Sequence, residues 1–222
     1  MNPLDNPIHA ALHSVHRRFA IQADGFVRYP PEVAPFCAVP DADADVSAAV
    51  ATLLAPGEST YLLGIAPRAL RDAHVIAYHP LAQMVCDEPL AAVPGPAVIP
   101  LTDEHRDDVM TLTALVYPHY FRPRTMEMGR YFGLYESGRL AAMIGERLGS
   151  DTTREISAVC THPDFNGRGF ARRLMALLTN DLLARGLQPY LHVSHENARA
   201  KALYLRVGFR VRREIGFFAL RR

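Results

Sequence analysis

The sequence predicts a mixed α/β (α+β) fold in which a central sheet carries helices on both faces. The second half alternates strand-like and helix-like patterns in the order β-α-α-β-β-β-α-β-α-β. A loop with two glycines separates a β-rich run from a long amphipathic helix. Hydrophobic residues make up 49% of the 222-residue chain, which is enough to build a sizeable core.

A proline-rich join at Val93–Pro96 divides the chain into two predicted domains, residues 1–95 and 96–222. The first domain has weak patterns and no chemical motif. Its expected elements are helices over 10–21 and 46–54, the second capped by the aspartates of 41–45, and strands over 59–65 and 83–86.

The second domain has clearer patterns. A helix is expected to start at Thr102, followed by acidic residues, and Gly186 is expected to end the long amphipathic helix. The predicted strands cover 97–99, 131–135, 140–148, 154–161, 190–194 and 209–220, and the further helices cover 124–129, 170–185 and 197–207.

Composition argues against several classes of protein. The formal net charge of +1 does not favour a nucleic-acid partner. No apolar run approaches a membrane span, and the first residues lack a signal-peptide pattern. Three widely spaced cysteines without a C-x-x-C pair argue against a disulfide framework and a structural zinc, and predict a cytoplasmic protein.

The glycine loop, Asn166-Gly167-Arg168-Gly169-Phe170-Ala171, is the most informative stretch. A loop that runs directly into a helix exposes free backbone N–H groups at the positive end of the helix dipole. Glycine allows a phosphate to approach the backbone closely. No Gly-Lys-Ser/Thr follows, and Arg172 stands where a dinucleotide fingerprint needs a small residue. The loop therefore predicts a phosphorylated ligand of another kind.

A second stretch, His192 to Phe209, contains a strand, an Asn-started helix, Leu203-Tyr204 and Gly208-Phe209. Together the two stretches resemble the GNAT superfamily, the acyl-CoA-dependent N-acyltransferases, over roughly residues 97–222. The superfamily loop reads Arg/Gln-x-x-Gly-x-Gly/Ala, so Asn166 departs from its first position. The runs 128–133 and 157–163 resemble the subgroup containing glycine N-acyltransferase-like proteins, which implies a degenerate GNAT-like first domain.

The resemblance implies acetyl-CoA as co-substrate, without a metal, and a small-molecule amine or amino acid as acceptor. Backbone N–H groups from Gly167 to Arg172 would hold the pyrophosphate of coenzyme A. The strand edge at Val159, Cys160 and Thr161 would pair with the pantetheine arm and polarise the thioester carbonyl. Asn197 would cap its helix and contact the same arm. The groups assigned to the cofactor are Val159, Cys160, Thr161, Gly167, Arg168, Gly169, Phe170, Ala171, Arg172 and Asn197.

Three side chains are candidates for proton transfer. Tyr204 falls on the superfamily's general-acid position, where a phenol would protonate the leaving thiolate; the alternative is a packed core tyrosine. Glu155 and His192 are alternative general bases, and each could instead be a solvated or backbone-bonded residue at a strand end. Cys160 lacks a nucleophile's His–Asp partners and is expected to be a small buried hydrophobe.

Other residues leave the acceptor open. His9, His13 and His16 have helical spacing, and a solvated helix face is expected there rather than a metal site. The segment 117–124 suits an aromatic or carboxylate-bearing acceptor, or is an ordinary packed loop. The predicted function is acetyl transfer to a primary amine, by a monomer or homodimer. The alternatives are a non-catalytic acyl-CoA-binding regulatory module and an enzyme that uses longer acyl groups.

Overall fold

A seven-stranded sheet forms the centre of the protein, as a computed structural model covering residues 2–222 shows. The strand order is β12-β6-β11-β10-β9-β8-β7, and only the β10–β11 pair is parallel. The strands are β6 (Leu81–Val85), β7 (Ile99–Leu101), β8 (Tyr131–Glu136), β9 (Arg139–Gly149), β10 (Thr153–Thr161), β11 (Gln188–Ser194) and β12 (Arg210–Ile215).

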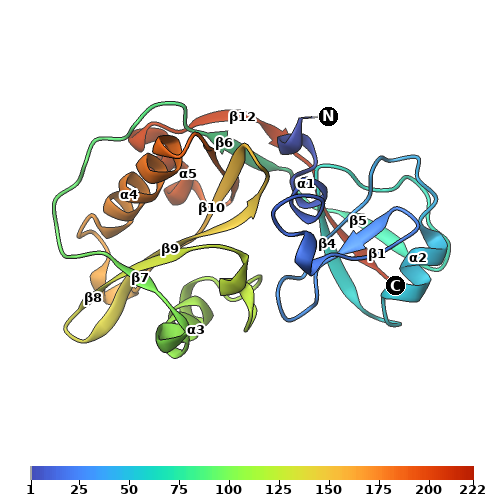
Figure 1. Cartoon of the computed structure of the whole chain (residues 1–222), viewed down its shortest axis with the longest axis horizontal. Coiled ribbons are helices and arrows are strands. Elements are labelled where there is room, and N and C mark those ends of the chain that lie inside the picture. The colour runs from blue at the N-terminus through green and yellow to red at the C-terminus, as the bar shows by residue number, and fades with distance from the viewer. Residues whose placement is uncertain (1) are drawn as a thin grey trace.

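Helices cover both faces of this sheet, as predicted. On β9, Met143 packs in one cluster with Val109 and Leu112 of α3 (Arg106–Val116). The neighbouring Ile144 packs on the other side with Leu174 of α4 (Phe170–Ala184), because successive side chains of a strand point to opposite faces. The helix α5 (Ala198–Val207) lies beside α4 (Figure 1), and its Tyr204 packs in the same cluster as Leu174.

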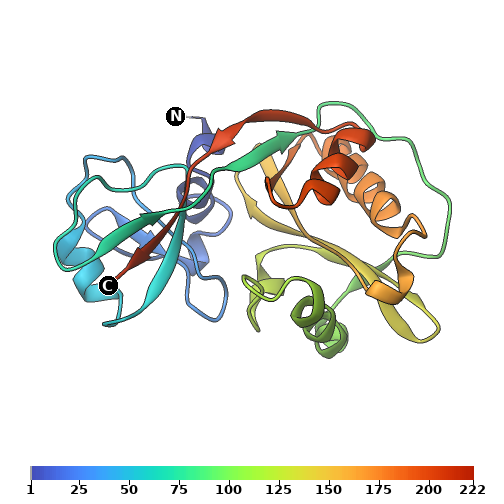
Figure 2. The same ribbon diagram turned by 180° about the vertical axis from the view of Figure 1, so that it is seen from behind.

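Two small three-stranded sheets and two short helices make a second lobe (Figures 1 and 2). Their orders are β1-β2-β3 and β4-β13-β5. The helices are α1 (Pro7–Leu12) and α2 (Ser47–Leu53), and the strands are β1 (Ile21–Ala23), β2 (Phe26–Arg28), β3 (Cys37–Ala38), β4 (Ser59–Leu63), β5 (His74–Ala77) and β13 (Phe217–Arg221). Short 3₁₀ turns cover Pro3–Asp5, Arg17–Phe19, Asp103–His105, Thr125–Met128 and Pro163–Phe165.

The two halves of the sequence exchange strands. β6 comes from the first half, yet it lies between β11 and β12 in the central sheet. β13 ends the chain, yet it pairs with β4 and β5, so the C-terminus lies in the second lobe (Figure 2). The boundary between residues 95 and 96 and the GNAT-like character of the first domain stay predictions. β6 precedes that boundary in the sequence but belongs to the central sheet, and β13 follows it but belongs to a sheet of the second lobe.

Several expected elements differ from the structure. The helix predicted over 10–21 is wrong, since α1 ends at Leu12 and a 3₁₀ turn and β1 follow. The single strand predicted over 209–220 divides at Gly216 into β12 and β13. His16 is 3% exposed, so it does not belong to a solvated helix face. Its Nε2 donates to the Met128 carbonyl (2.7 Å) and its Nδ1 accepts from the Tyr29 hydroxyl (2.8 Å).

Candidate active site

The parallel strands β10 and β11 separate shortly after they meet. Their register covers only Thr153 to Glu155 on β10, while the far edge of β11 continues to pair with β6. The rest of β10 therefore presents a backbone edge without a neighbouring strand. Such an edge carries free N–H and C=O groups that can bind an extended ligand.

A bulge shapes this edge of β10. The register against β9 shifts between Ser157 and Cys160, and Ala158 has a left-handed φ of 50°. Ala158 and Val159 have no partner in the β9 register. The N–H of His162 donates to the carbonyl of Ala141 on β9 (2.9 Å). Because the backbone groups of successive residues in a strand face opposite edges, those of Cys160 also face β9, whereas those of Thr161 face the open edge. Val159 and Thr161 are thus better placed than Cys160 to offer backbone groups.

The glycine loop leads straight into α4, as predicted. Gly167 and Gly169 have φ values of 79° and 80°, in the left-handed region that favours glycine. A Cβ at either position would meet no atom within 4 Å, so the loop faces open space. No side chain caps α4, and its first N–H groups are free to bind an anion. Phe170 is buried in the core, so only its backbone is available.

Asn166, which departs from the superfamily pattern, contacts the other motif. Its Oδ1 accepts a hydrogen bond from Arg199 Nη2 (3.3 Å), in the first turn of α5. Asn197 caps that helix as expected, because its side chain accepts from the backbone N–H of Ala200 (3.0 Å). The glycine loop and the start of α5 therefore lie together at one end of the open β10 edge.

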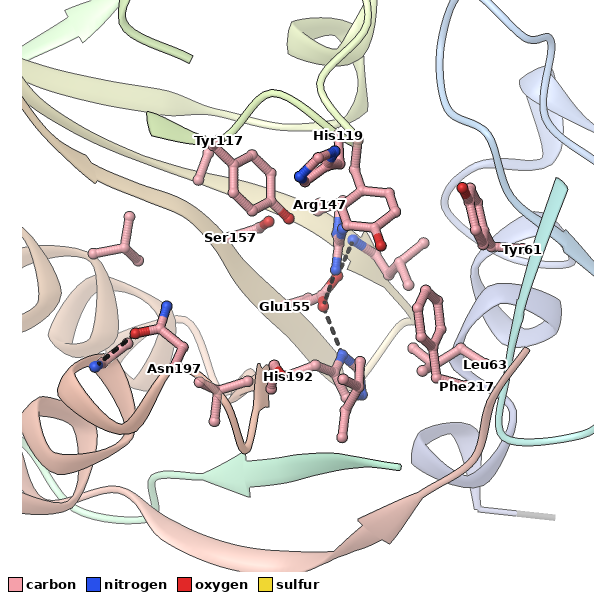
Figure 3. Close-up of a pocket in the computed structure, with 18 of the residues that line it drawn as sticks. Tyr61, Leu63, Tyr117, His119, Arg147, Glu155, Ser157, His192, Asn197 and Phe217 are labelled. Carbon is pink, nitrogen blue, oxygen red and sulfur yellow. Dashed lines mark hydrogen bonds and ion pairs between the residues drawn. The ribbon is translucent and has the colours of Figure 1, made fainter. Parts of the chain in front are cut away.

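A cavity of about 640 Å³ opens along this edge. It is lined by Glu155 and Val159 of β10, His192 of β11, and Asn197 and Tyr204 of α5. The structure thus brings together all three candidates for proton transfer. The glycine loop and Cys160 do not line the cavity. Figure 3 shows Asn197 at one end, with Glu155 and His192 near the middle.

Glu155 is completely buried and forms a two-point ion pair with Arg147 (Nε–Oε2 2.8 Å, Nη2–Oε1 2.7 Å). Its Oε2 also accepts from the N–H of Leu148 (3.2 Å). Burial alone would raise the pKa of the Glu155 carboxyl, but the charge and hydrogen bonds of Arg147, together with His192, hold that pKa well below its usual range. Glu155 is therefore a poor direct acceptor for an amine proton.

His192 is bonded through both ring nitrogens. Its Nδ1 donates to Glu155 Oε1 (2.7 Å), and its Nε2 lies 3.0 Å from Gln83 Nε2. Gln83 also donates to the Leu4 carbonyl and accepts from Arg212, which fixes the orientation of its amide. Gln83 therefore donates to His192 Nε2, which is the acceptor in this arrangement.

Tyr204 lines the cavity from α5 and is 8% exposed. Its hydroxyl has no hydrogen-bond partner within residues 2–222. Burial raises the pKa of the phenol above its usual range, so Tyr204 stays protonated at neutral pH. Burial also raises the pKa of the Cys160 thiol to about 12, which agrees with its expected role as a buried hydrophobe.

Sequence reasoning missed most of the polar network and the side of the cavity that the first half of the chain forms. Arg147 stands inside a strand-like run and Gln83 inside a short strand of the first half, and neither belongs to a motif. Phe36 and Tyr61 come from the half that lacks chemical signals, yet both line the cavity. The strand pairings of β6 and β13 bring Gln83 and the aromatic residues of the first half to the site, whereas Arg147 lies on β9 of the central sheet. The expected loop residues Tyr117, His119 and Tyr120 do line it.

Two searches of the described part of the chain give negative findings. In residues 2–222, no helix is both long and apolar enough to cross a membrane. Within the same residues, no group of three or more His, Cys, Asp or Glu side chains is arranged to hold a metal ion.

A solved structure from Novosphingobium aromaticivorans, named as an acetyltransferase of the GNAT family, is 31% identical to this chain. The match covers 99% of this chain and 98% of that one, with a TM-score of 0.88. The chain belongs to the GNAT family. Residues 131–217 also match the family described as FR47-like protein. That match contains the glycine loop, the open β10 edge and all of α5.

More distant GNAT structures share the fold. A GCN5-related N-acetyltransferase from Kribbella flavida is 16% identical over 100% of this chain and 96% of its own, with a TM-score of 0.63. A GNAT acetyltransferase from Colwellia psychrerythraea is 17% identical over 65% of this chain and 57% of its own, with a TM-score of 0.55. No protein with a curated function matches the chain. None of these findings supports the glycine N-acyltransferase-like subgroup.

Proposed function

We propose that this GNAT protein transfers an acetyl group from acetyl-CoA to the primary amine of a small molecule. The observation that carries the proposal is the open, bulged edge of β10, which runs from the uncapped start of α4 into the cavity. The pyrophosphate would bind the N–H groups of residues 167–172, and the pantetheine arm would pair with Val159 and Thr161. The thioester supplies an activated acyl group.

The residues of this chain have distinct roles in the proposal. A backbone N–H of the bulge would stabilise the charge that develops on the carbonyl oxygen. Tyr204 would donate its proton to the departing sulfur, since it is a protonated phenol without another partner. The amine proton would go to His192 Nε2 after its bond to Gln83 opens, while Glu155 holds Nδ1.

A non-catalytic acyl-CoA-binding module is the second candidate, and one observation favours it. Both possible bases are fully bonded, Glu155 to Arg147 and His192 to Gln83, so neither presents a free lone pair to the cavity. A catalyst must break one of these bonds in each cycle, whereas a binding module keeps them. A glycine N-acyltransferase-like enzyme would use a longer acyl group or a small amino acid as acceptor.

The test has two parts. Calorimetry with acetyl-CoA should show binding, and thiol release should then be followed across a panel of primary amines. Binding with amine-dependent thiol release supports the enzyme, whereas binding without release for any amine or acyl-CoA supports the binding module. The absence of any coenzyme A binding would refute both. A series of acyl-CoA chain lengths with one good amine decides whether acetyl is the preferred group.

A further inference from the structure

The cavity has an aromatic wall at the end away from Asn197. Six side chains form it, and they come from both halves of the sequence. Three belong to the first half, two to the segment after α3, and one to the start of β13: Phe36, Tyr61, Tyr78, Tyr117, Tyr120 and Phe217. Figure 3 shows Tyr61 and Phe217 across the cavity from Asn197, with Glu155 between.

The rings of this wall pack closely on one another. Tyr61 stacks on Phe217 with centroids 5.6 Å apart and an interplanar angle of 18°. Tyr120 meets the edge of Tyr61 at 5.4 Å and that of Phe217 at 6.2 Å. Tyr78 adds a ring 5.4 Å from Phe217. Such contacts hold the wall in a fixed shape, because aromatic pairs have preferred geometries.

The wall is nevertheless not a closed core. Tyr78 is 46% exposed, and Tyr61, Tyr117, Tyr120 and Phe217 are half-buried. Within residues 2–222, none of the four tyrosine hydroxyls has a hydrogen-bond partner. An aromatic surface inside a concave site, with hydroxyl groups that are free to form hydrogen bonds, is typical of a ligand pocket.

The charges near the wall do not provide an anchor for a carboxylate. Arg124 pairs with Glu127 and Glu32 outside the cavity, and Arg122 does not line it. Arg147 lines it, but Glu155 neutralises that guanidinium through two hydrogen bonds. Within residues 2–222, no unpaired arginine or lysine side chain lines the cavity, so apolar and π contacts would dominate recognition at the wall.

Position decides which substrate the wall contacts. The donor would enter beside Asn197 and Val159, so its thioester would end near Ser157 and Glu155. A group on the wall lies beyond that point, on the side from which the amine approaches. We propose, resting on the proposed acetyl transfer, that the acceptor is an amine with an aromatic ring, and that the ring binds the wall. The first half of the chain thus selects the acceptor through Tyr61.

The test compares amines with acetyl-CoA as donor, each rate being expressed per unprotonated amine: 2-phenylethylamine and tyramine against butylamine, spermidine and glutamate. The arylalkylamines should have kcat/KM values at least about tenfold higher than those of the other amines. Tyr61→Leu should remove most of this preference, because kcat/KM for the arylalkylamines should fall much further than kcat/KM for butylamine, while acetyl-CoA still binds. Tyr135→Leu, on β8 away from the cavity, is the matched control and should keep the preference.

Calorimetry gives a readout that does not need turnover. With coenzyme A bound, 2-phenylethylamine should bind wild-type protein more tightly than it binds the Tyr61→Leu variant. Equal or better use of butylamine, spermidine or glutamate, with turnover intact, would overturn the aromatic acceptor while leaving acetyl transfer standing. Faster reaction of butylamine with benzoyl-CoA than with acetyl-CoA would overturn it too, because the ring on the wall would then belong to the acyl group.

Discussion

At the cofactor end of the cavity the proposed contacts come from the backbone, whereas at the aromatic wall they come from side chains. The cofactor end is built from segments of the second half: the β10 edge and the start of α5 line the cavity, and the glycine loop lies beside the start of α5. The wall needs both halves, and β13 carries Phe217 across to Tyr61. Backbone contacts depend on side-chain identity only at the glycines that keep the backbone accessible, whereas contacts from a wall of side chains depend on each residue in it. One end can thus be shared by a family while the other varies.

Tyr204 lines the cavity from α5, and its replacement is expected to have the largest effect. Tyr204→Phe removes only the hydroxyl, so acetyl-CoA should bind as before while kcat falls by about 100-fold to 10,000-fold. Stopped-flow thiol release with a good amine measures kcat, and calorimetry measures the affinity. Tyr135→Phe is the control. An unchanged kcat would remove Tyr204 from the mechanism and leave it as a packing residue.

The Arg147–Glu155 ion pair lines the cavity and is also expected to stabilise the folded protein. Glu155→Gln leaves the Arg147 guanidinium, with a side chain only 13% exposed, without its counter-charge. The free energy of unfolding should fall by about 3–5 kcal/mol in urea denaturation. Glu127→Gln, whose pair with Arg124 is much more exposed, should cost about 1 kcal/mol or less. Equal losses would show that burial does not distinguish the two pairs.

His16 joins the two lobes and gives stability a dependence on pH. Burial, more than its charged neighbours, lowers the pKa of His16 to about 4, whereas the unfolded chain has the ordinary value near 6.5. Between these values the unfolded state binds a proton that the folded state refuses. Acidification from pH 6.5 to 4 should therefore cost about 3 kcal/mol of unfolding free energy. In urea denaturation at a series of pH values, the unfolding free energy of the His16→Gln variant should depend less steeply on pH than that of the wild-type protein. An identical pH dependence would contradict the role of His16.

The sequence predicted the elements of the fold and of the cofactor end that depend on local patterns. The strand expected over 154–161 is β10 at Thr153–Thr161, and the helix after the glycine loop is α4. Strand alternation, a loop with two glycines and an asparagine cap all act within a few residues, so one stretch of sequence contains the signal. The same holds for Tyr204, which a local motif placed on α5.

The wall and the polar network could not be predicted because they depend on pairing between distant segments. Nothing near Gln83 indicates that β6 will insert between β11 and β12, and nothing near Gly216 indicates that β13 will leave the central sheet. Register between strands far apart in sequence is set by the packing of the whole molecule. His16 was misjudged for the same reason, since its partners Tyr29 and Met128 come from other elements.

The smallest expected effect tests the backbone at the cofactor end. Gly169→Ala places a Cβ at a left-handed φ of 80°, which costs roughly 1–2 kcal/mol, and the Cβ points into open space where the pyrophosphate would lie. The Kd for acetyl-CoA should rise about tenfold by calorimetry, while the preference for aromatic amines persists. Gly57→Ala is a close match, with φ 80° and equally open space in the second lobe, between α2 and β4. It introduces the same backbone strain away from the glycine loop, so the Kd of that variant for acetyl-CoA should stay unchanged. If both variants weaken binding alike, strain in the fold explains the loss, and the glycine loop is not the phosphate cradle.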